Sequence, residues 1–286
     1  MKKTIILNII LSCSVLLTAC SLKGEKEPIP QPDITPVTST EETVQPEEPV
    51  PEPEEIIPEA THMGDFVIAG DRLTATGGAY EQDGKTSNGA EPIEWLVLED
   101  TGDSLLLVSK DILDCKTYGE GYGETDWENS YIRKWLNEDF YNAAFNDSEK
   151  ELISDYVTKE GDVSSSIPSL TDKVFLLNYA EVKKLFKKAT DSYCEERSAH
   201  VSEYAKSLGV WTIDESGYEL FGFKDRELSE EIIGAGNWWL RDNGAKNTQA
   251  MDVGAGGNIR LTGHDVGSKL DGVRPAIRIS IPSGNQ

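Results

Sequence analysis

The sequence predicts an α+β fold that combines a β-hairpin, several short helices and a glycine-rich antiparallel β region at the C-terminal end. Residues 92–110 hold two apolar runs separated by a glycine-containing turn. Residues 126–208 carry apolar side chains at helical spacing together with helix-capping pairs, and residues 238–281 alternate in short runs broken by glycine. Strands and helices that follow one another in blocks are typical of an α+β domain.

The first block predicts two paired strands. Residues 92–100 read PIEWLVLED and residues 104–110 read SLLLVSK, and both are rich in apolar residues. Thr101, Gly102 and Asp103 separate them, which is a short hairpin connection.

The second block predicts a helix that starts at Asp126 and continues to about residue 145. Tyr131, Trp135 and Phe140 recur near helical spacing, which indicates one buried face. Asp126 is a residue type that favours the helix N-cap position.

Two Asn-x-x-Glu patterns predict capping boxes that open further helices. Asn146 precedes Glu149, and Asn178 precedes Glu181. The apolar residues 173–178 just before the second box predict a short buried strand.

The last helix is expected at residues 199–208, where Gly209 ends it. The region that follows predicts short strands joined by glycine-rich turns. Pro275 lies inside the last of them and indicates an edge strand or a bulge, because proline cannot donate a ladder hydrogen bond. These strands are expected at residues 238–241, 249–253, 258–262 and 273–281.

The N-terminus predicts export. Residues 1–20 read MKKTIILNIILSCSVLLTAC, with two lysines, an apolar stretch and a cysteine at the end. Leu-Thr-Ala before Cys20 resembles the lipobox of bacterial lipoproteins. This resemblance implies that residues 1–19 are a removed signal peptide, and that a lipid on Cys20 anchors the protein to the outside of the bacterial cell membrane.

Residues 20–62 predict a disordered stalk. Residues 21–62 hold nine of the 13 prolines of the chain, 11 acidic residues, two lysines and no aromatic residue. Such a segment cannot bury enough apolar surface to fold. Residues 63–286 are expected to form a single globular domain.

The charge of the expected domain argues against nucleic acid as a partner. Residues 63–286 carry 23 basic and 40 acidic residues. A field of that sign repels phosphate backbones.

Cys115 and Cys194 are the two cysteines of the expected domain. Outside the cytoplasm they could form a disulfide, or each could be a buried thiol. A metal site formed by Cys194 and His200 is a third alternative, although their spacing is loose.

Four residues near the C-terminus are expected to be structural. Trp238 and Trp239 are adjacent in a predicted strand, so their side chains point to opposite faces and cannot form one flat ligand platform. Arg241 and Arg274 are expected to join the terminal strands through hydrogen bonds to backbone or carboxylate.

Polar residues on the glycine-rich loops are the candidates for ligand binding, since binding residues concentrate on loops. Their oxygen atoms could hold Ca²⁺, although Asn and Asp in such loops are more often turn formers. These candidates are Asp242, Asn243, Asp252, Asn258, His264 and Asp265. No H-E-x-x-H, G-x-S-x-G or C-x-x-C motif is present, and no catalytic residue is assigned.

Several segments together resemble a family of uncharacterised bacterial surface-protein domains, over residues 92–281. They are IEWLVLE, LLLVSKDILDCKTY, TDWENSYIRKWLNEDFYNAAFNDSEKELI, DKVFLLNYAEVKKLF, WWLR and GVRPAIRI. The WWLR and GVRPA segments also resemble the C-type-lectin-like fold of formylglycine-generating enzymes, the sulfatase-modifying factors. The resemblance implies a C-type-lectin-like domain. The reactive cysteine pair of those enzymes has no counterpart here.

We therefore expect a cell-surface lipoprotein whose domain binds a glycan, a wall polymer or a protein without catalysis. One alternative is an extracytoplasmic enzyme related to formylglycine-generating enzymes or to hydrolases. Another is a structural spacer at the cell surface.

Overall fold

The computed structural model describes residues 59–158, 170–186 and 188–282. The expected signal peptide, Cys20 and most of the expected stalk lie outside these residues. No helix in the described part is long and apolar enough to cross a lipid bilayer. Its first strand begins at Thr61, close to the expected domain boundary.

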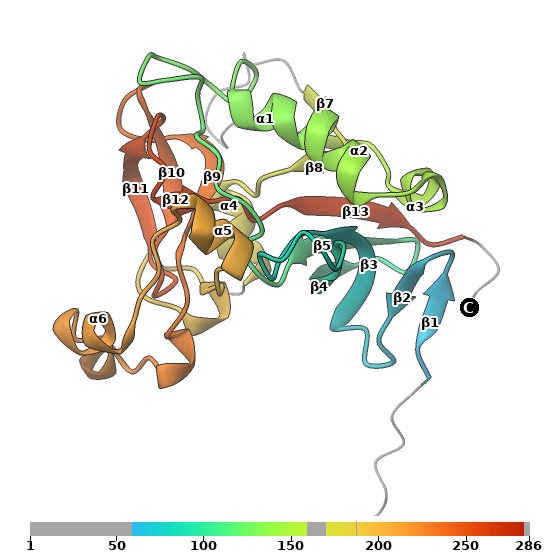
Figure 1. The fold of residues 1–286 in the computed structure, drawn as a ribbon, viewed down its shortest axis with the longest axis horizontal. Helices are drawn as coiled ribbons and strands as arrows, with labels where there is room; N and C mark the ends of the chain where they lie inside the picture. The colour runs from blue at the N-terminus through green and yellow to red at the C-terminus, as the bar shows by residue number, and fades with distance from the viewer. Residues whose placement is uncertain (1–58, 159–169, 187, 283–286) are drawn as a thin grey trace, which may run out of the picture. The chain divides into compact units, whose positions relative to one another are not determined.

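The largest sheet has seven strands, and every neighbouring pair is antiparallel (Figure 1). The predicted hairpin is present as its fourth and fifth strands, with Trp95 opposite Ser109. In spatial order the strands are β1 (Thr61–Met63), β2 (Phe66–Ile68), β3 (Thr74–Tyr80), β4 (Glu91–Asp100), β5 (Ser104–Ser109), β13 (Ala276–Ser280) and β8 (Val174–Phe175).

A second sheet contains the glycine-rich C-terminal region. Its order is β11 (Ile259–Asp265), β10 (Gln249–Val253), β9 (Asn237–Asn243) and β12 (Asp271–Gly272). The pairs β10–β11 and β9–β10 are antiparallel, whereas β12 runs parallel to β9. A third sheet pairs β6 (Tyr156–Thr158) with β7 (Leu170–Asp172). The fold is therefore a mixed α+β class with mostly antiparallel sheets, as the sequence predicts.

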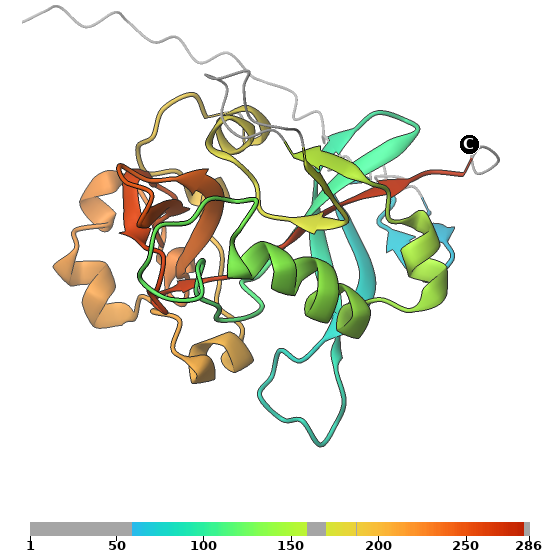
Figure 2. The same ribbon diagram turned by 90° about the horizontal axis from the view of Figure 1, so that it is seen from above.

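The predicted long helix begins later than expected. It comprises α1 (Tyr131–Trp135), a π-helical turn (Leu136–Phe140) and α2 (Tyr141–Ala144), which follow one another without a break. Ser130, not Asp126, is the N-cap, since its side chain accepts a hydrogen bond from the Arg133 amide. Asp126 instead accepts from the Asn129 amide in the preceding turn. Figure 2 shows this helical segment from above.

Both predicted capping boxes are confirmed. Asn146 and Glu149 cap α3 (Asp147–Leu152), and Asn178 and Glu181 cap α4 (Tyr179–Leu185). In each box the asparagine side chain accepts from the glutamate amide, and the glutamate accepts from the asparagine amide. These reciprocal bonds satisfy amides that a short helix leaves unpaired.

The segment between α4 and β9 consists of short helices. Gly209 ends α5 in a left-handed conformation, as expected, but this helix starts only after Ser202. The helices here are a 3₁₀ turn (Glu195–Arg197), α5 (Glu203–Leu208), α6 (Glu215–Leu220) and 3₁₀ turns at Lys224–Arg226 and Glu230–Ile232.

The expectation that Pro275 marks an edge strand or a bulge is wrong, since residues 276–280 pair with β5 without a register shift. Strand β13 lies inside the seven-stranded sheet, between β5 and β8. Pro275 directly precedes it and needs no ladder donor there, while its carbonyl accepts from the Ser109 amide at 2.9 Å.

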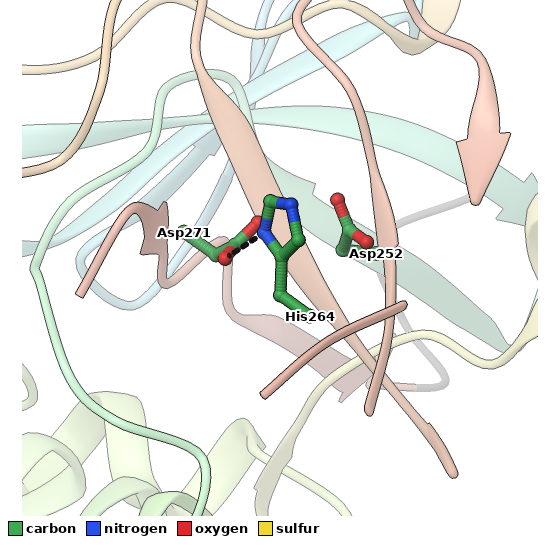
Figure 3. Close-up of side chains that lie close together, drawn as sticks. All are labelled: Asp252, His264 and Asp271. Atoms are coloured by element: carbon green, nitrogen blue, oxygen red, sulfur yellow. Dashed lines mark hydrogen bonds and ion pairs between the residues drawn. The ribbon is translucent and has the colours of Figure 1, made fainter. Parts of the chain in front are cut away.

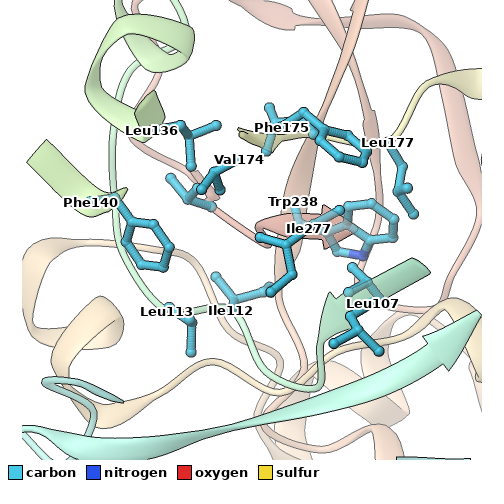
Figure 4. Packing of buried hydrophobic residues seen from close by; sticks show 14 of the residues in the cluster. Leu107, Ile112, Leu113, Leu136, Phe140, Val174, Phe175, Leu177, Trp238 and Ile277 are labelled. Atoms are coloured by element: carbon cyan, nitrogen blue, oxygen red, sulfur yellow. The ribbon is translucent and has the colours of Figure 1, made fainter. Parts of the chain in front are cut away.

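One apolar core joins the two larger sheets and the α1–α2 segment (Figure 4). Trp238 and Trp239 are both fully buried in it, so neither forms a surface platform. Their indole N–H groups donate in different places, to the carbonyls of Arg197 and Lys116. Adjacent strand residues on opposite faces explain this arrangement.

Arg241 and Arg274 are buried, and both donate hydrogen bonds to backbone carbonyls. Arg241 donates to the Leu176 carbonyl and to both carboxylate oxygens of Glu181. Arg274 donates to the Ser109 carbonyl at 2.9 Å and stacks over the Trp238 ring. Burial lowers the pKa of Arg274 to about 10, which still leaves it charged at neutral pH.

Candidate functional site

A cavity of about 460 Å³ lies where the β10–β11 turn meets the segment around α6. Two other cavities, of about 480 and 570 Å³, are lined mainly by polar and charged side chains with one aromatic each. Ligand sites usually combine apolar walls with a few convergent polar groups. The cavity beside α6 fits that pattern best, and we call it the aromatic cavity.

Four aromatic residues form one wall of the aromatic cavity: Tyr193, Trp211, Phe221 and Phe223. The rings contact one another at mostly steep angles, with centroids 6.0 Å apart for Trp211 and Phe221 and 5.7 Å for Tyr193 and Phe223. Phe221 is 48% exposed. Tyr193 and Trp211 are half-buried and Phe223 is buried, so it is the first two rings and Phe221 that border open space.

A charged network stands on the other side of the cavity. Arg260 donates from Nε to Asp252 Oδ2 at 2.7 Å, and its Nη2 lies 3.4 Å from Asp271 Oδ1. His264 Nδ1 lies 2.6 Å from Asp271 Oδ2. Figure 3 shows the imidazole between the two carboxyl groups. Both aspartates are fully buried, whereas the Arg260 and His264 side chains are about 30% exposed.

Strand pairing assembles this network. Asp252 on β10 lies directly opposite Arg260 on β11. His264 lies farther along β11, beyond a register shift. Asp271 is brought in by the parallel pairing of β12 with β9, where it lies opposite Asn237. Residues from three strands thus converge because β9 and β10 form the centre of the sheet.

Asp252, His264 and Asp271 have the donor atoms of a metal site, all within 4.8 Å of one another. Carboxylate and imidazole are common ligands of divalent metals. Arg260 already binds Asp252 and approaches Asp271, so its charge occupies the place that a cation would take. As arranged, the group is a charge-paired network, and the expectation of Ca²⁺ gains no support from it.

The network is expected to make stability depend on pH. Burial, together with the charge of Asp271, raises the pKa of Asp252 from 3.8 to about 7. The hydrogen bond to Asp271 raises the pKa of His264 above 6.5. In both cases the folded chain holds a proton that the unfolded chain has released.

We therefore expect the free energy of unfolding to fall as the pH rises from about 4 to about 7 through Asp252, and to fall further above 6.5 through His264. The contribution of His264 is complete below 6.5 and is lost as the pH passes its raised pKa. Asp252→Asn should flatten the curve, because the asparagine cannot ionise. Urea unfolding at several pH values measures this, and parallel curves for the two proteins would contradict the assignment.

The structure brings together three of the six candidate binding residues. Asn258 and His264 line the aromatic cavity, and Asp252 lies behind it. The other three lie elsewhere. Asp242 Oδ2 accepts from the Tyr179 amide at 2.6 Å, and burial raises its pKa.

Asn243 and Asp265 belong to turns and strand ends. The Asn243 amide donates to the Thr125 carbonyl at 3.2 Å. Asp265 is exposed at the last position of β11. Both are therefore explained by local structure.

Cys115 and Cys194 are free, buried thiols and form no disulfide. Cys115 donates to the Lys269 carbonyl, and Cys194 donates to Glu196. Burial raises the pKa of both thiols, which lowers their thiolate fraction. In the described part of the chain neither Cys194 nor His200 belongs to a metal-type cluster. His200 Nε2 lies 2.6 Å from the Glu231 carbonyl instead.

Sequence reasoning missed the aromatic wall, Arg226 and Asp271. Trp211, Phe221 and Phe223 lie in a segment of short helices without a long apolar period. Their spacing therefore gave no signal. Asp271 is followed by glycine, so it looked like an ordinary turn residue.

A family comparison matches residues 102–281, which is more than half of the chain, to a family described as "Domain of unknown function (DUF6273)". No curated protein and no solved structure matches the chain. The landmark segments from β5 to β13 fall within the matched range, and so does the aromatic cavity. The chain therefore belongs to this family of domains of unknown function.

Proposed function

We propose that this chain is a lipid-anchored protein of the bacterial cell surface whose domain binds a glycan in the aromatic cavity without catalysis. The observation that carries the proposal is an open aromatic wall facing a set of polar groups across about 460 Å³. The signal and lipobox resemblance supports the location. The C-type-lectin-like resemblance of the WWLR and GVRPA segments is compatible with a recognition domain.

The aromatic wall suits a sugar ring. One face of many sugars presents C–H bonds, and these pack against the electron-rich face of an aromatic ring. Trp211 and Phe221 are partly or largely exposed at the cavity. A soluble domain rarely leaves such rings together in a hollow unless they bind something.

The facing residues suit hydroxyl groups. The Asn258 side chain makes no hydrogen bond to any described residue, so its amide can both donate and accept. Asn237 accepts from the Ala255 amide through Oδ1, which leaves its NH₂ group for a ligand. A hollow with such groups supports recognition over a spacer role.

A hydrolase is the second candidate, because Asp271 holds Nδ1 of His264 in the way that orients a general base. Figure 3 shows the second ring nitrogen directed toward the Asp252 side of the network, where a base would not meet a substrate easily. The raised pKa of both thiols argues against the formylglycine-type alternative. Recognition is therefore the first choice.

The test is a binding screen of polysaccharides and purified bacterial cell walls with residues 54–286, which form one compact unit. Trp211→Ala is expected to weaken binding roughly 30-fold, the effect of losing an aromatic contact of about 2 kcal/mol. Tyr122→Ala is the matched control, because Tyr122 is 72% exposed and does not line the cavity.

Three outcomes of the screen distinguish the candidate functions. Equal binding by wild type and Trp211→Ala would move the site elsewhere, and no binding to any glycan or wall preparation would overturn the proposal. Release of sugar fragments that His264→Gln abolishes would favour the hydrolase.

A further inference from the structure

The ionisable side chains that line the aromatic cavity are all basic, whereas the chain as a whole is acidic. The chain has 51 acidic and 27 basic residues. The lining of the cavity contains Arg226, Arg260 and His264, and no aspartate or glutamate. On a surface dominated by carboxylates, a hollow without a single acidic lining residue is the exception to be explained.

Arg226 is a cation without a carboxylate partner. Its guanidinium lies over the Tyr193 ring, 4.4 Å from the centroid, and its Nε lies 3.5 Å from the Phe221 carbonyl. No ion pair links Arg226 to any acidic residue that the structure describes. Glu195, Glu196 and Glu227 line the neighbouring cavity, which Arg226 also borders. The N–H groups of its two Nη atoms therefore remain for a ligand.

Arg260 is the member of the charged network that brings a positive charge to the cavity lining. Asp252 and Asp271 are fully buried behind it, whereas Arg260 keeps 30% of its side chain exposed. His264 stands beside it, with Nδ1 held by Asp271. Arg260 and His264 thus line the cavity, whereas the two carboxyl groups do not.

We infer that the ligand of the aromatic cavity is an acidic glycan, whose carboxylate or phosphate group is bound by Arg226 and Arg260 while a sugar ring packs against Trp211 and Phe221. This inference rests on the proposed function and names the class of glycan. The two Nη groups of Arg226 offer paired donors that match the oxygens of either anion, and Arg260 adds its Nη1 group, because its Nε and Nη2 bind the aspartates.

The surrounding negative charge adds selectivity. Acidic polymers are repelled by most of the surface, so they approach productively only where the cations lie. Arg226 is exposed and the Arg260 side chain is 30% exposed, so added salt should weaken their attraction for an anionic ligand.

In the experiment, each acidic polysaccharide of the screen is immobilised on an array in three forms. These are the intact polymer, the polymer with its carboxyl groups reduced to alcohols, and the polymer with its phosphate removed by hydrofluoric acid. Loss of binding after carboxyl reduction identifies a carboxylate, and loss after phosphate removal identifies a phosphate. Either result supports the inference. Arg226→Gln should weaken binding of the intact polymer roughly tenfold or more, since hydrogen bonds to charged groups are the stronger class.

The control is Arg72→Gln, because Arg72 is a partly exposed arginine paired with Asp100 and does not line the cavity. Arg226→Lys should retain part of the affinity by keeping the charge. Equal binding of all three forms, or of neutral and acidic polymers, would overturn the inference and leave glycan binding standing. Absence of binding to every glycan would overturn both.

Discussion

Arg241→Met is expected to lower the free energy of unfolding by about 3–5 kcal/mol, the range for removing one partner of a buried ion pair. Arg241 is 1% exposed, and its guanidinium binds both oxygens of Glu181 at 2.6 and 2.7 Å. Methionine fills much of the space but leaves the Glu181 charge and the Leu176 carbonyl without their donor. Urea unfolding measures the loss.

The reason for so large an effect is that Glu181 serves two structures at once. It completes the capping box at Asn178, and it accepts from the Tyr156 hydroxyl at 3.0 Å. Arg241 thereby links β9 to the start of α4.

Arg278→Met is the matched control, because its pair with Glu99 is more exposed and should contribute about 1 kcal/mol or less. Adding Glu181→Gln to Arg241→Met should restore part of the stability, since the uncompensated charge is removed. A loss below about 1 kcal/mol for Arg241→Met would show that the pair is not a major stabilising contact.

Gly257→Ala is expected to destabilise the domain by more than about 3 kcal/mol, through two separate effects. The backbone there has φ +71°, a conformation that L side chains rarely adopt. An added Cβ would also lie 1.8 Å from the Cys194 carbonyl oxygen, so the β10–β11 turn would have to move away from that segment.

Two other glycines separate these effects. Gly84 has φ +76° with nothing within 4 Å, so Gly84→Ala should show the backbone effect alone, of about 1–2 kcal/mol. Gly121 has open space and no positive φ, so Gly121→Ala should change little. Thermal unfolding compares the three. A Gly257→Ala effect no larger than that of Gly84→Ala would mean that the turn relaxes without difficulty.

The parts of the fold that the sequence predicts are those that local chemistry decides. The Asn146 and Asn178 boxes each need only four consecutive residues, and the β4–β5 hairpin needs only its turn. The strands β1, β2 and β3 were missed, because TATGGAY and its neighbours lack a clear alternation and acquire their role from sheet pairing. The prediction drawn from Pro275 was wrong for the same reason. The place of β13 in the sheet depends on pairing with strands that are distant in the sequence.

The candidate site was predicted only in part, because some of its residues come together through contacts between distant parts of the sequence. Asp252 and His264 share one hairpin, so their proximity follows from the turn between β10 and β11. Asp242 and Asn243 are close in sequence to the same region, but β9 carries them away from the turn. Trp211 and Phe221 reach the cavity from a segment whose packing no periodic pattern indicates.

The position of β13 determines when the largest sheet can fold during synthesis. This strand joins β5 to β8, yet its residues 276–280 follow both of those strands in the chain and are synthesised after them. Until they emerge, the largest sheet remains in two pieces with unpaired inner edges, and the chain cannot close. The seven-stranded sheet can therefore be completed only after residues 276–280 have been synthesised. A chain clipped before Ala276 should be cleared by proteases instead of surviving as a smaller domain.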